Sequence, residues 1–383
     1  MRAGLGVAAG LAAGVALIAA AVPAAAAAPG AAAASPPAWR VVRVPSSVVS
    51  PAELADVSAS GPANAWAVGA EAETGLSLGT PLILHWNGRA WSKVGLRGVP
   101  GPGRLSAVSA GSRSDAWVLG TDKLGTVLLH WNGRRWHMVG FPGQATAAMN
   151  SVAAATAGSA WLAGSRKDAA GNDEILVERW NGAAWRIVAT RLGRGVINKV
   201  RVSANGDVWA AGASPASSPL IAHEHRGAWT SFPGPEPNSI ELRDLLARSA
   251  RDVWTGGFRS GGALLQPVIS HWNGRTWTSV IVPTGVFGGV LSISPDRAGL
   301  PQWAGTDSGV NGPTTLYDFF NGRAWSSVPG ATALAGIFDA ATVTAHIPFT
   351  NATWGVGGSV VDHGQGIQPF RAIIEFNPGP PPA

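Results

Sequence analysis

The chain has 383 residues, of which 13% are charged and 46% are hydrophobic, and its formal net charge is +6. Its 51 glycines and 18 tryptophans are typical of a turn-rich, aromatic-packed β protein and exclude a disordered chain. It has no cysteine, which excludes disulfides, thiolate chemistry and cysteine-ligated zinc. The modest basic excess fits attraction to anionic polymers, and we expect no specific nucleic-acid site.

The N-terminus predicts export from the cell. Met1 and Arg2 precede an apolar stretch from Gly6 to Val22, which an alanine-rich run with several possible cleavage points follows. This pattern predicts a signal peptide over residues 1–28 and an Ala/Pro linker over residues 29–37. A membrane anchor is the alternative, but the segment lacks the Leu, Ile and Phe density of a stable span. We therefore expect a secreted, bacterial protein with no membrane span after cleavage.

Two short motifs alternate along the rest of the chain. The first motif is a polar residue, a small residue and a Trp, with a Gly three positions after the Trp. Its Trp recurs every 44 to 51 residues, at positions 66, 117, 161, 209, 254, 303 and 354. The second is an apolar run that ends in Trp-Asn-Gly-x-x-Trp. Clear copies span 86–91, 131–136, 180–185 and 272–277, and degenerate copies end at Trp229 and Trp325. Asn-Gly between two aromatic-rich runs is a strong hairpin signal.

Each repeat is expected to form four short strands, which we name A to D. In the second complete repeat they fall at 105–110, 116–120, 127–131 and 136–139. Four strands in about 40–50 residues are typical of a propeller blade. A β-sandwich is the alternative, but seven in-phase copies argue against it. The sequence therefore predicts an all-β, seven-bladed β-propeller with four antiparallel strands per blade over residues 38–378, followed by a Pro-rich tail over 379–383.

The two ends of the repeat region complement each other. Residues 38–42 match a strand D with no A, B or C before it, and residues 373–377 match a strand C with no D after it. Pairing them removes open sheet edges, which otherwise invite aggregation. We predict that the N-terminal strand completes the last blade, and that truncation of residues 38–45 destabilises the whole ring.

The blade pattern resembles known propeller repeats over nearly the whole mature chain. The Gly that ends strand B, doubled at 256–257 and 357–358, is similar to the Gly of kelch repeats and of the galactose oxidase propeller. The Asn-Gly-x-x-Trp hairpin resembles the Asp-box turn of sialidase-type propellers, with His85-Trp86-Asn87 where the Asp-box Ser and Asp would stand. Both resemblances imply the fold. Neither implies an activity, because a copper radical site needs a cysteine and the sialidase nucleophile pair and arginine triad cannot be assembled.

Most conspicuous residue types follow the repeat and are interpreted as structural. All 18 tryptophans fall in strands B, C or D, so packing is preferred to sugar stacking. One strand position recurs as His85, His130 and His271, and blades that diverge around an axis would not bring these residues to one ion. The polar residues before strand B are expected to cap Asx turns (Asn64, Asp115, Asp207 and Asp252). The hairpin arginines would form a basic fringe on one rim (Arg89, Arg134, Arg275 and Arg323).

One loop carries weak metal candidates. Asp168, Asn172, Asp173 and Glu174 surround a Gly turn between strands B and C of the third repeat. Their oxygens could hold calcium, but the spacing does not match an EF-hand loop. We expect no metal and no cofactor. The chain has no G-x-S-x-G elbow and no phosphate-binding loop of the Walker type.

The connections divide into two sets. The A–B and C–D turns are short and uniform, whereas the B–C and D–A loops vary in length and content and would open on the opposite face. The sequence therefore predicts a monomeric, non-enzymatic binding or scaffold propeller that recognises a protein or cell-envelope glycan through its B–C/D–A loop face. The alternative is an extracellular carbohydrate-active hydrolase or lyase with its site at the axial mouth, built from carboxylates of different blades.

Overall fold

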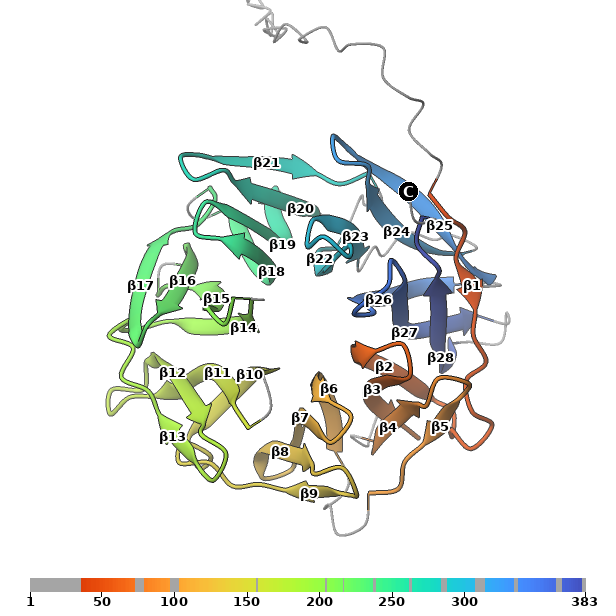
Figure 1. Ribbon diagram of the computed structural model, residues 1–383, viewed down its shortest axis with the longest axis horizontal. Coiled ribbons are helices and arrows are strands. Elements are labelled where there is room, and N and C mark those ends of the chain that lie inside the picture. Colours follow the sequence, from red (N-terminus) through yellow and green to blue (C-terminus); the bar gives the residue numbers. More distant parts are fainter. Residues whose placement is uncertain are drawn as a thin grey trace, which may run out of the picture. The chain divides into compact units, whose positions relative to one another are not determined.

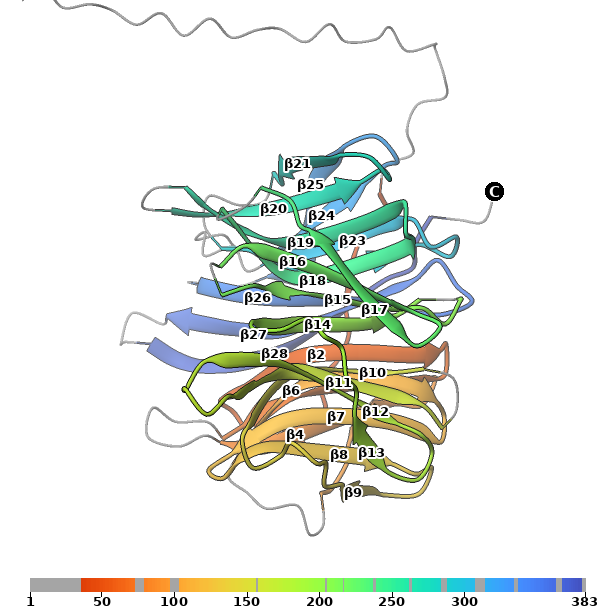
Figure 2. The same cartoon turned by 90° about the vertical axis from the view of Figure 1, so that its left-hand side faces the viewer.

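The computed structural model describes residues 36–72, 79–96, 103–155, 158–203, 205–215, 217–236, 239–261, 264–283, 288–306, 314–333, 337–362 and 367–380. These residues belong to one compact unit, Ser35–Ala383. They form seven four-stranded antiparallel sheets arranged around a central axis, as Figure 1 shows along the axis and Figure 2 from the side. The described part of the chain contains strands and turns and no helix, and so no helix able to cross a membrane. The predicted signal peptide and most of the predicted linker lie outside the described residues.

The sheets follow the chain order, and strand A of each lies nearest the axis (Figure 1). Blade I comprises β2 (Ala52–Gly61), β3 (Asn64–Glu71), β4 (Thr80–Trp86) and β5 (Trp91–Lys93). Blade II comprises β6 (Gly103–Ser112), β7 (Asp115–Asp122), β8 (Gly125–Trp131) and β9 (Trp136–Met138). Blade III comprises β10 (Ala147–Ala154), β11 (Ala160–Lys167), β12 (Asp173–Trp180) and β13 (Trp185–Ile187). Blade IV comprises β14 (Val196–Val202), β15 (Val208–Ala213), β16 (Pro219–His225) and β17 (Ala228–Pro233).

The remaining blades keep this pattern. Blade V comprises β18 (Ile240–Ser249), β19 (Asp252–Gly261), β20 (Leu264–Trp272) and β21 (Trp277–Ile281). Blade VI comprises β22 (Val290–Pro295), β23 (Pro301–Thr306), β24 (Thr314–Phe320) and β25 (Trp325–Ala333). Blade VII comprises β26 (Ile337–His346), β27 (Thr353–Asp362), β28 (Ile367–Asn377) and the N-terminal β1 (Arg40–Val41). The predicted seven-bladed fold is confirmed, and strands A and B extend further at both ends than the motifs alone indicated.

The ring is closed by the N-terminal strand, as predicted. Arg40 and Val41 pair antiparallel with Phe376 and Glu375 of β28. Trp39, which comes just before this short strand, is buried and stacks on the ring of Tyr317 in blade VI at a centroid distance of 3.9 Å. The closing strand therefore ties blade VII to blade VI through one large side chain as well as through the sheet ladder.

A bulge in strand A explains the Gly that ends each strand-B motif. In blades I to VI the register shifts at one equivalent step of strand A, for example between Leu54 and Asp56. The bulge brings a strand-A carbonyl over the glycine of strand B, and a Cβ built on Gly69 would overlap the carbonyl oxygen of Glu53. Glycine is needed here because two backbones approach closely, a usual role for glycine in a strand.

In blades I, III, V and VI the bulge also turns a polar side chain toward the next blade. This side chain accepts a hydrogen bond from a backbone amide in strand A of the following blade, and it satisfies an amide that has no partner in its own sheet. Such inner-ring bonds join Val108 N to Asp56, Val200 N to Ser151, Ile293 N to Asp244 and Thr344 N to Ser292, at 2.8–3.1 Å. The blades are thus linked near the axis by hydrogen bonds as well as by apolar packing.

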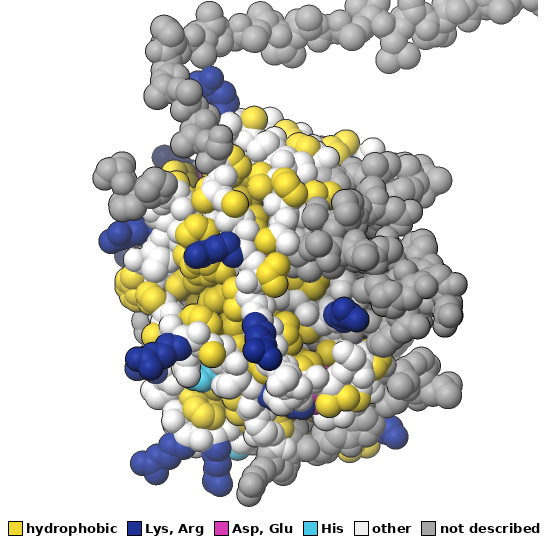
Figure 3. Space-filling view, turned by 90° about the vertical axis from the view of Figure 1, so that its right-hand side faces the viewer, with side chains coloured by type: hydrophobic (Ala, Val, Ile, Leu, Met, Phe, Trp, Pro, Cys, Tyr) yellow, Lys and Arg dark blue, Asp and Glu magenta, His cyan; other side chains and the backbone are white. Residues whose placement is uncertain are grey.

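Tryptophan packing links the blades further out. In four blades the strand-B Trp packs against the aromatic residue that ends strand C of the following blade, with centroids 5.0–5.3 Å apart: Trp66 with Trp131, Trp117 with Trp180, Trp254 with Phe320 and Trp354 with Trp86. None of the 18 tryptophans is exposed. The outer wall of the ring seen in Figure 3 shows scattered Lys and Arg and very few acidic side chains.

Candidate functional site

Three hollows open around the axis on the face that carries the A–B and C–D turns, which we call the turn face. The largest, of about 990 Å³, lies between blades III and IV. The axial channel holds a second, of about 340 Å³, and a third of about 460 Å³ lies beside blades IV to VI. Val202, at the end of β14, borders all three. Blade IV is therefore the blade around which the described hollows gather.

The largest hollow, here called the III/IV cleft, lies where blade IV departs from the repeat. The last position of strand C holds Trp or Phe in five blades and Asn377 in blade VII, and in four of the five it packs on the strand-B Trp of the preceding blade. In blade IV this position is Glu224, so Trp161 of blade III has no aromatic cover there. A carboxylate is smaller than an indole, and the III/IV cleft opens beside this position, where Ala110 and Gly111 of blade II and Pro348 of blade VII also border it.

The lining of the III/IV cleft is mixed. It combines Trp161 with polar and charged side chains of both blades and with small residues of the turns: Ser159, Arg179, Asn205, Gly206, Glu224, Arg226 and Gly227. The Arg179 guanidinium lies over the Trp161 ring, 5.2 Å from its centroid, where other blades place a histidine. Glu224 is nearly buried, and its Oε1 accepts a 2.5 Å hydrogen bond from Gly227 N, which fixes the carboxylate. The cleft thus offers charges of both signs above a buried aromatic ring, which is 5% exposed.

The cleft leads to the axial channel, which contains a structural charge cluster. Asp244 in β18 is fully buried and forms a bidentate pair with Arg201 of β14, at 2.9 and 2.6 Å. Burial works to raise the pKa of Asp244, but Arg201 and Lys199 hold it below its usual range. Burial raises the pKa of Asp56, the matching residue of blade I, against the opposing effect of Lys199. Both carboxylates also accept inner-ring amides, so they serve the ring itself.

The recurring histidines belong to a second structural motif. In blades I, II and V the strand-C histidine stacks on the strand-B Trp at 3.9–4.2 Å. Its Nε2 meets the polar residue before strand B at 2.7–2.9 Å, in the pairs His85–Asn64, His130–Asp115 and His271–Asp252. The structural interpretation of these histidines fits this arrangement.

The expected Asx-turn role of Asn64, Asp115, Asp207 and Asp252 is therefore wrong, because their side chains face strand C. The Asx turns are instead made by the hairpin asparagines of the C–D turns. Asn87 Oδ1, for example, accepts from Arg89 N and Ala90 N at 2.9 and 3.1 Å.

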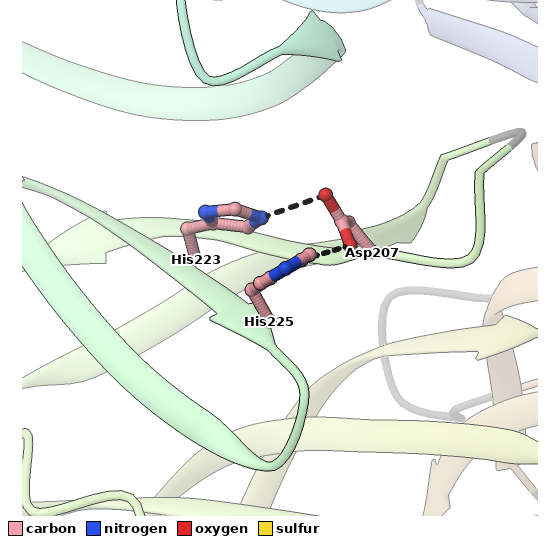
Figure 4. Close-up of side chains that lie close together, drawn as sticks. All are labelled: Asp207, His223 and His225. Carbon is pink, nitrogen blue, oxygen red and sulfur yellow. Dashed lines mark hydrogen bonds and ion pairs between the residues drawn. The ribbon is translucent and has the colours of Figure 1, made fainter.

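Blade IV departs from this motif by a second substitution. His223 occupies the usual stacked position on Trp209, but the hairpin asparagine is replaced by His225. Figure 4 shows both imidazoles directed at the carboxylate of Asp207. His225 Nδ1 lies 2.8 Å from Oδ1 of Asp207, and His223 Nε2 lies 3.1 Å from Oδ2. Burial works to raise the pKa of Asp207, but contacts from His225, His223 and Asn205 hold it below its usual range.

The predicted weak metal candidates do not converge on an open point. Asp168 accepts from Ala170 N and Asn172 N and pairs with Arg194. Asp173 pairs with Lys167, and Glu174 pairs with Arg166. Each carboxylate of this loop is thus balanced by its own cation. Among the described residues, only Asp207, His223 and His225 bring three ligand atoms within 4.8 Å of one another.

The sequence interpretation missed Glu224, His223 and His225. All three lie in the degenerate copy that ends at Trp229, where His223-Glu224-His225 stands in place of His85-Trp86-Asn87. Aligning that copy residue by residue would have exposed both substitutions. Parts of the predicted B–C/D–A loop face, such as residues 73–78 and 97–102, lie outside the described residues. The four hairpin arginines that we expected to form a basic fringe are exposed on the turn face: Arg89, Arg134, Arg275 and Arg323.

The fold places the chain in one class of architecture, the seven-bladed β-propeller. No protein-family model matches the chain, and no curated protein matches it. Among solved structures, YCF48 bound to a D1 peptide is similar at 16% identity and TM-score 0.56, over 90% of this chain and 96% of that one. A streptogramin B lyase is similar at 9% identity and TM-score 0.57, over 88% and 97%. The GH74 xyloglucanase of Xanthomonas campestris is similar at 15% identity and TM-score 0.52, over 84% and 53%. At these identities the likeness establishes the propeller fold.

Proposed function

We propose that this protein is a secreted, non-enzymatic binding propeller that holds a segment of a protein or of a cell-envelope glycan in the III/IV cleft. The observation that carries the proposal is the cleft beside Glu224, which stands where five other blades have an interblade aromatic residue. The cleft volume of about 990 Å³ is at the upper end of ordinary ligand sites. Arg179, Arg226 and Glu224 supply polar contacts, and Trp161 lies buried beneath Arg179.

Other features of the turn face support the same location. Phe349, in the A–B turn of blade VII, is 78% exposed and has φ of 69°, a conformation that is costly for an aromatic residue. Its neighbour Pro348 borders both the cleft and the axial channel. Leu300, in the corresponding turn of blade VI, is also exposed. Phe349 and Leu300 thus add exposed apolar side chains to the turn face, and the arginine fringe would attract an anionic ligand to this face.

The axial carboxylates favour a binding role over a hydrolase or lyase activity. Paired carboxylates for glycoside chemistry need free oxygens facing the substrate. The axial Asp56 and Asp244 are instead engaged by backbone amides, and Asp244 also by Arg201. Propeller neighbours include a structure with a bound peptide, YCF48, and an enzyme, the xyloglucanase. The same fold therefore serves both roles, and the site decides between them.

The test is a comparison of Glu224→Trp with the unmodified protein on a glycan array and a peptide library. Trp at 224 restores the repeat and replaces the Glu224 carboxylate at the wall of the cleft with an indole, so we expect at least about tenfold weaker binding to every ligand that the unmodified protein retains. Phe320→Trp is the matched control, because it makes an aromatic exchange at the equivalent position of blade VI and should leave binding unchanged.

Two outcomes would overturn parts of the proposal. If Glu224→Trp binds normally but Leu124→Ala loses binding, the ligand sits on the loop face, where Leu124 is 95% exposed, and the cleft assignment is wrong. If the protein degrades a polysaccharide of the panel with turnover, the non-enzymatic function is wrong.

A further inference from the structure

The cluster of Asp207, His223 and His225 has an arrangement that the other histidine motifs lack. In blades I, II and V one imidazole meets one side-chain oxygen, which is a complete hydrogen-bonded pair. In blade IV two imidazoles meet one carboxylate. One histidine is sufficient for the packing role, as the other blades show. The second histidine therefore needs its own explanation.

His225 does not serve the hairpin that it begins. In five other blades an asparagine at this position accepts two amides of the C–D turn with its side chain. In blade IV the turn is made without it: Glu224 Oε1 accepts from Gly227 N, and Arg226 and Gly227 adopt φ of 54° and 88°. The imidazole of His225 makes no hydrogen bond within the turn, and its Nδ1 lies 2.8 Å from Asp207 Oδ1.

The three donor atoms are arranged around one point. They lie within 4.8 Å of one another, and the ligand groups come from β16 and from Asp207, the residue just before the adjacent strand β15 (Figure 4). His223 Nε2 is 3.1 Å from Asp207 Oδ2 but is buried without a hydrogen bond, so the contact lacks hydrogen-bond direction. A buried nitrogen that lies close to a carboxylate oxygen without a hydrogen bond can share a metal ion with that oxygen.

The surroundings fix the ligands and leave the carboxylate charge available. Trp209 stacks on His223 with centroids 4.0 Å apart and planes 10° apart, which fixes the ring. Asn205 Nδ2 donates to Asp207 Oδ2 at 3.0 Å, as a second-shell partner does in metal sites. The matching Asp252 of blade V pairs with Arg248 at 2.5 Å. The ion pairs found for Asp207 within the described chain are those with the two histidines.

We propose that blade IV binds one divalent transition-metal ion of the zinc type through Asp207, His223 and His225. Two imidazole nitrogens and a carboxylate oxygen suit Zn²⁺, which takes such ligands at about 2.0–2.2 Å. Closing three atoms from within 4.8 Å to a shared tetrahedral centre needs only small rotations of side chains. His225 has 52% of its side chain exposed, so the ion can enter from solvent, and a fourth position stays open to water or to a ligand.

The proposal is tested by calorimetric titration of ZnCl₂ into the untagged, chelator-treated full chain. We expect one saturable site per chain. His225→Asn restores the asparagine of the other blades and should lower zinc affinity by at least about 10–100-fold, with an unchanged circular dichroism spectrum. His271→Asn is the control, since it alters the single-histidine pair of blade V and should leave zinc affinity unchanged.

Two results would overturn the proposal. One is the lack of saturable zinc binding by the unmodified chain. The other is a His225→Asn variant that binds zinc as tightly as the unmodified chain. Neither result affects the III/IV cleft, because the histidines are not among its lining residues and the Glu224→Trp comparison is made without added metal.

Discussion

Replacing Trp39 with alanine tests how the ring is held closed. Trp39 is 4% exposed, stacks on Tyr317 and meets the edge of Trp303 at 5.0 Å. A buried Trp hides up to about 250 Å², which at about 25 cal/mol per Å² contributes at most about 6 kcal/mol. Part of that area is already hidden in the unfolded chain. We therefore expect Trp39→Ala to lower the free energy of unfolding by about 4 kcal/mol, within the range for buried aromatic truncations.

The assay is urea denaturation followed by far-ultraviolet circular dichroism. Because β1 joins the first and last parts of the chain, the whole ring should unfold at a lower urea concentration with an unchanged m value. Val41→Ala is the control, since Val41 lies in the same strand but is 60% exposed, and it should change stability by less than about 0.5 kcal/mol. A loss below about 1 kcal/mol for Trp39→Ala, or a loss equal to that of Val41→Ala, would show that the closing strand adds little.

Two further predictions concern the inner ring. Asp244→Asn leaves Arg201 unpaired and should cost about 2–4 kcal/mol at pH 7, below the usual cost of breaking a buried pair because Arg201 keeps 33% of its side chain exposed. Because the folded-state pKa of Asp244 is lowered, its contribution is present above the unfolded value of about 3.9 and is lost as pH falls toward the folded value. Stability of the unmodified protein should thus fall more steeply below pH 4 than that of Asp244→Asn, and equal slopes in urea midpoints against pH would contradict this. Gly257→Ala should lower the free energy of unfolding by about 2 kcal/mol or more, because the added Cβ would overlap the carbonyl oxygen of Glu241. Gly61→Ala should have no such effect, because open space surrounds Gly61. Similar thermal midpoints for the two variants would refute the close-approach explanation.

The fold could be predicted because the repeat carries it. Trp66 and its equivalents, the Asn-Gly hairpins and the unpaired strands at the two ends were enough to set the blade number and the closure. The bulge in strand A could not be read from the sequence, since Asp56 and Ser151 share a position without sharing a residue type. For the same reason the inner-ring hydrogen bonds were not foreseen.

The candidate site was missed for a different reason. The repeat predicts the residues that the blades share, whereas the informative residues of blade IV are those that differ from the other blades. Glu224 matters because a neighbouring Trp161 loses its aromatic cover, and that consequence involves two blades and is visible only in the packing. The role of Asp207 was predicted from its own turn, whereas its partners come from the next strand. Sequence spacing does not reveal such cross-strand partners until the register is known.

Hydrogen exchange with and without the strongest ligand from the array or library tests the central claim most directly. If the III/IV cleft is the binding site, ligand should slow amide exchange in the turn-face segments Ser159–Trp161, Asn205–Gly206 and Glu224–Gly227 and leave the loop-face turn Asp122–Gly125 unchanged. Protection confined to the loop face, with no change in these three segments of blades III and IV, would contradict the account.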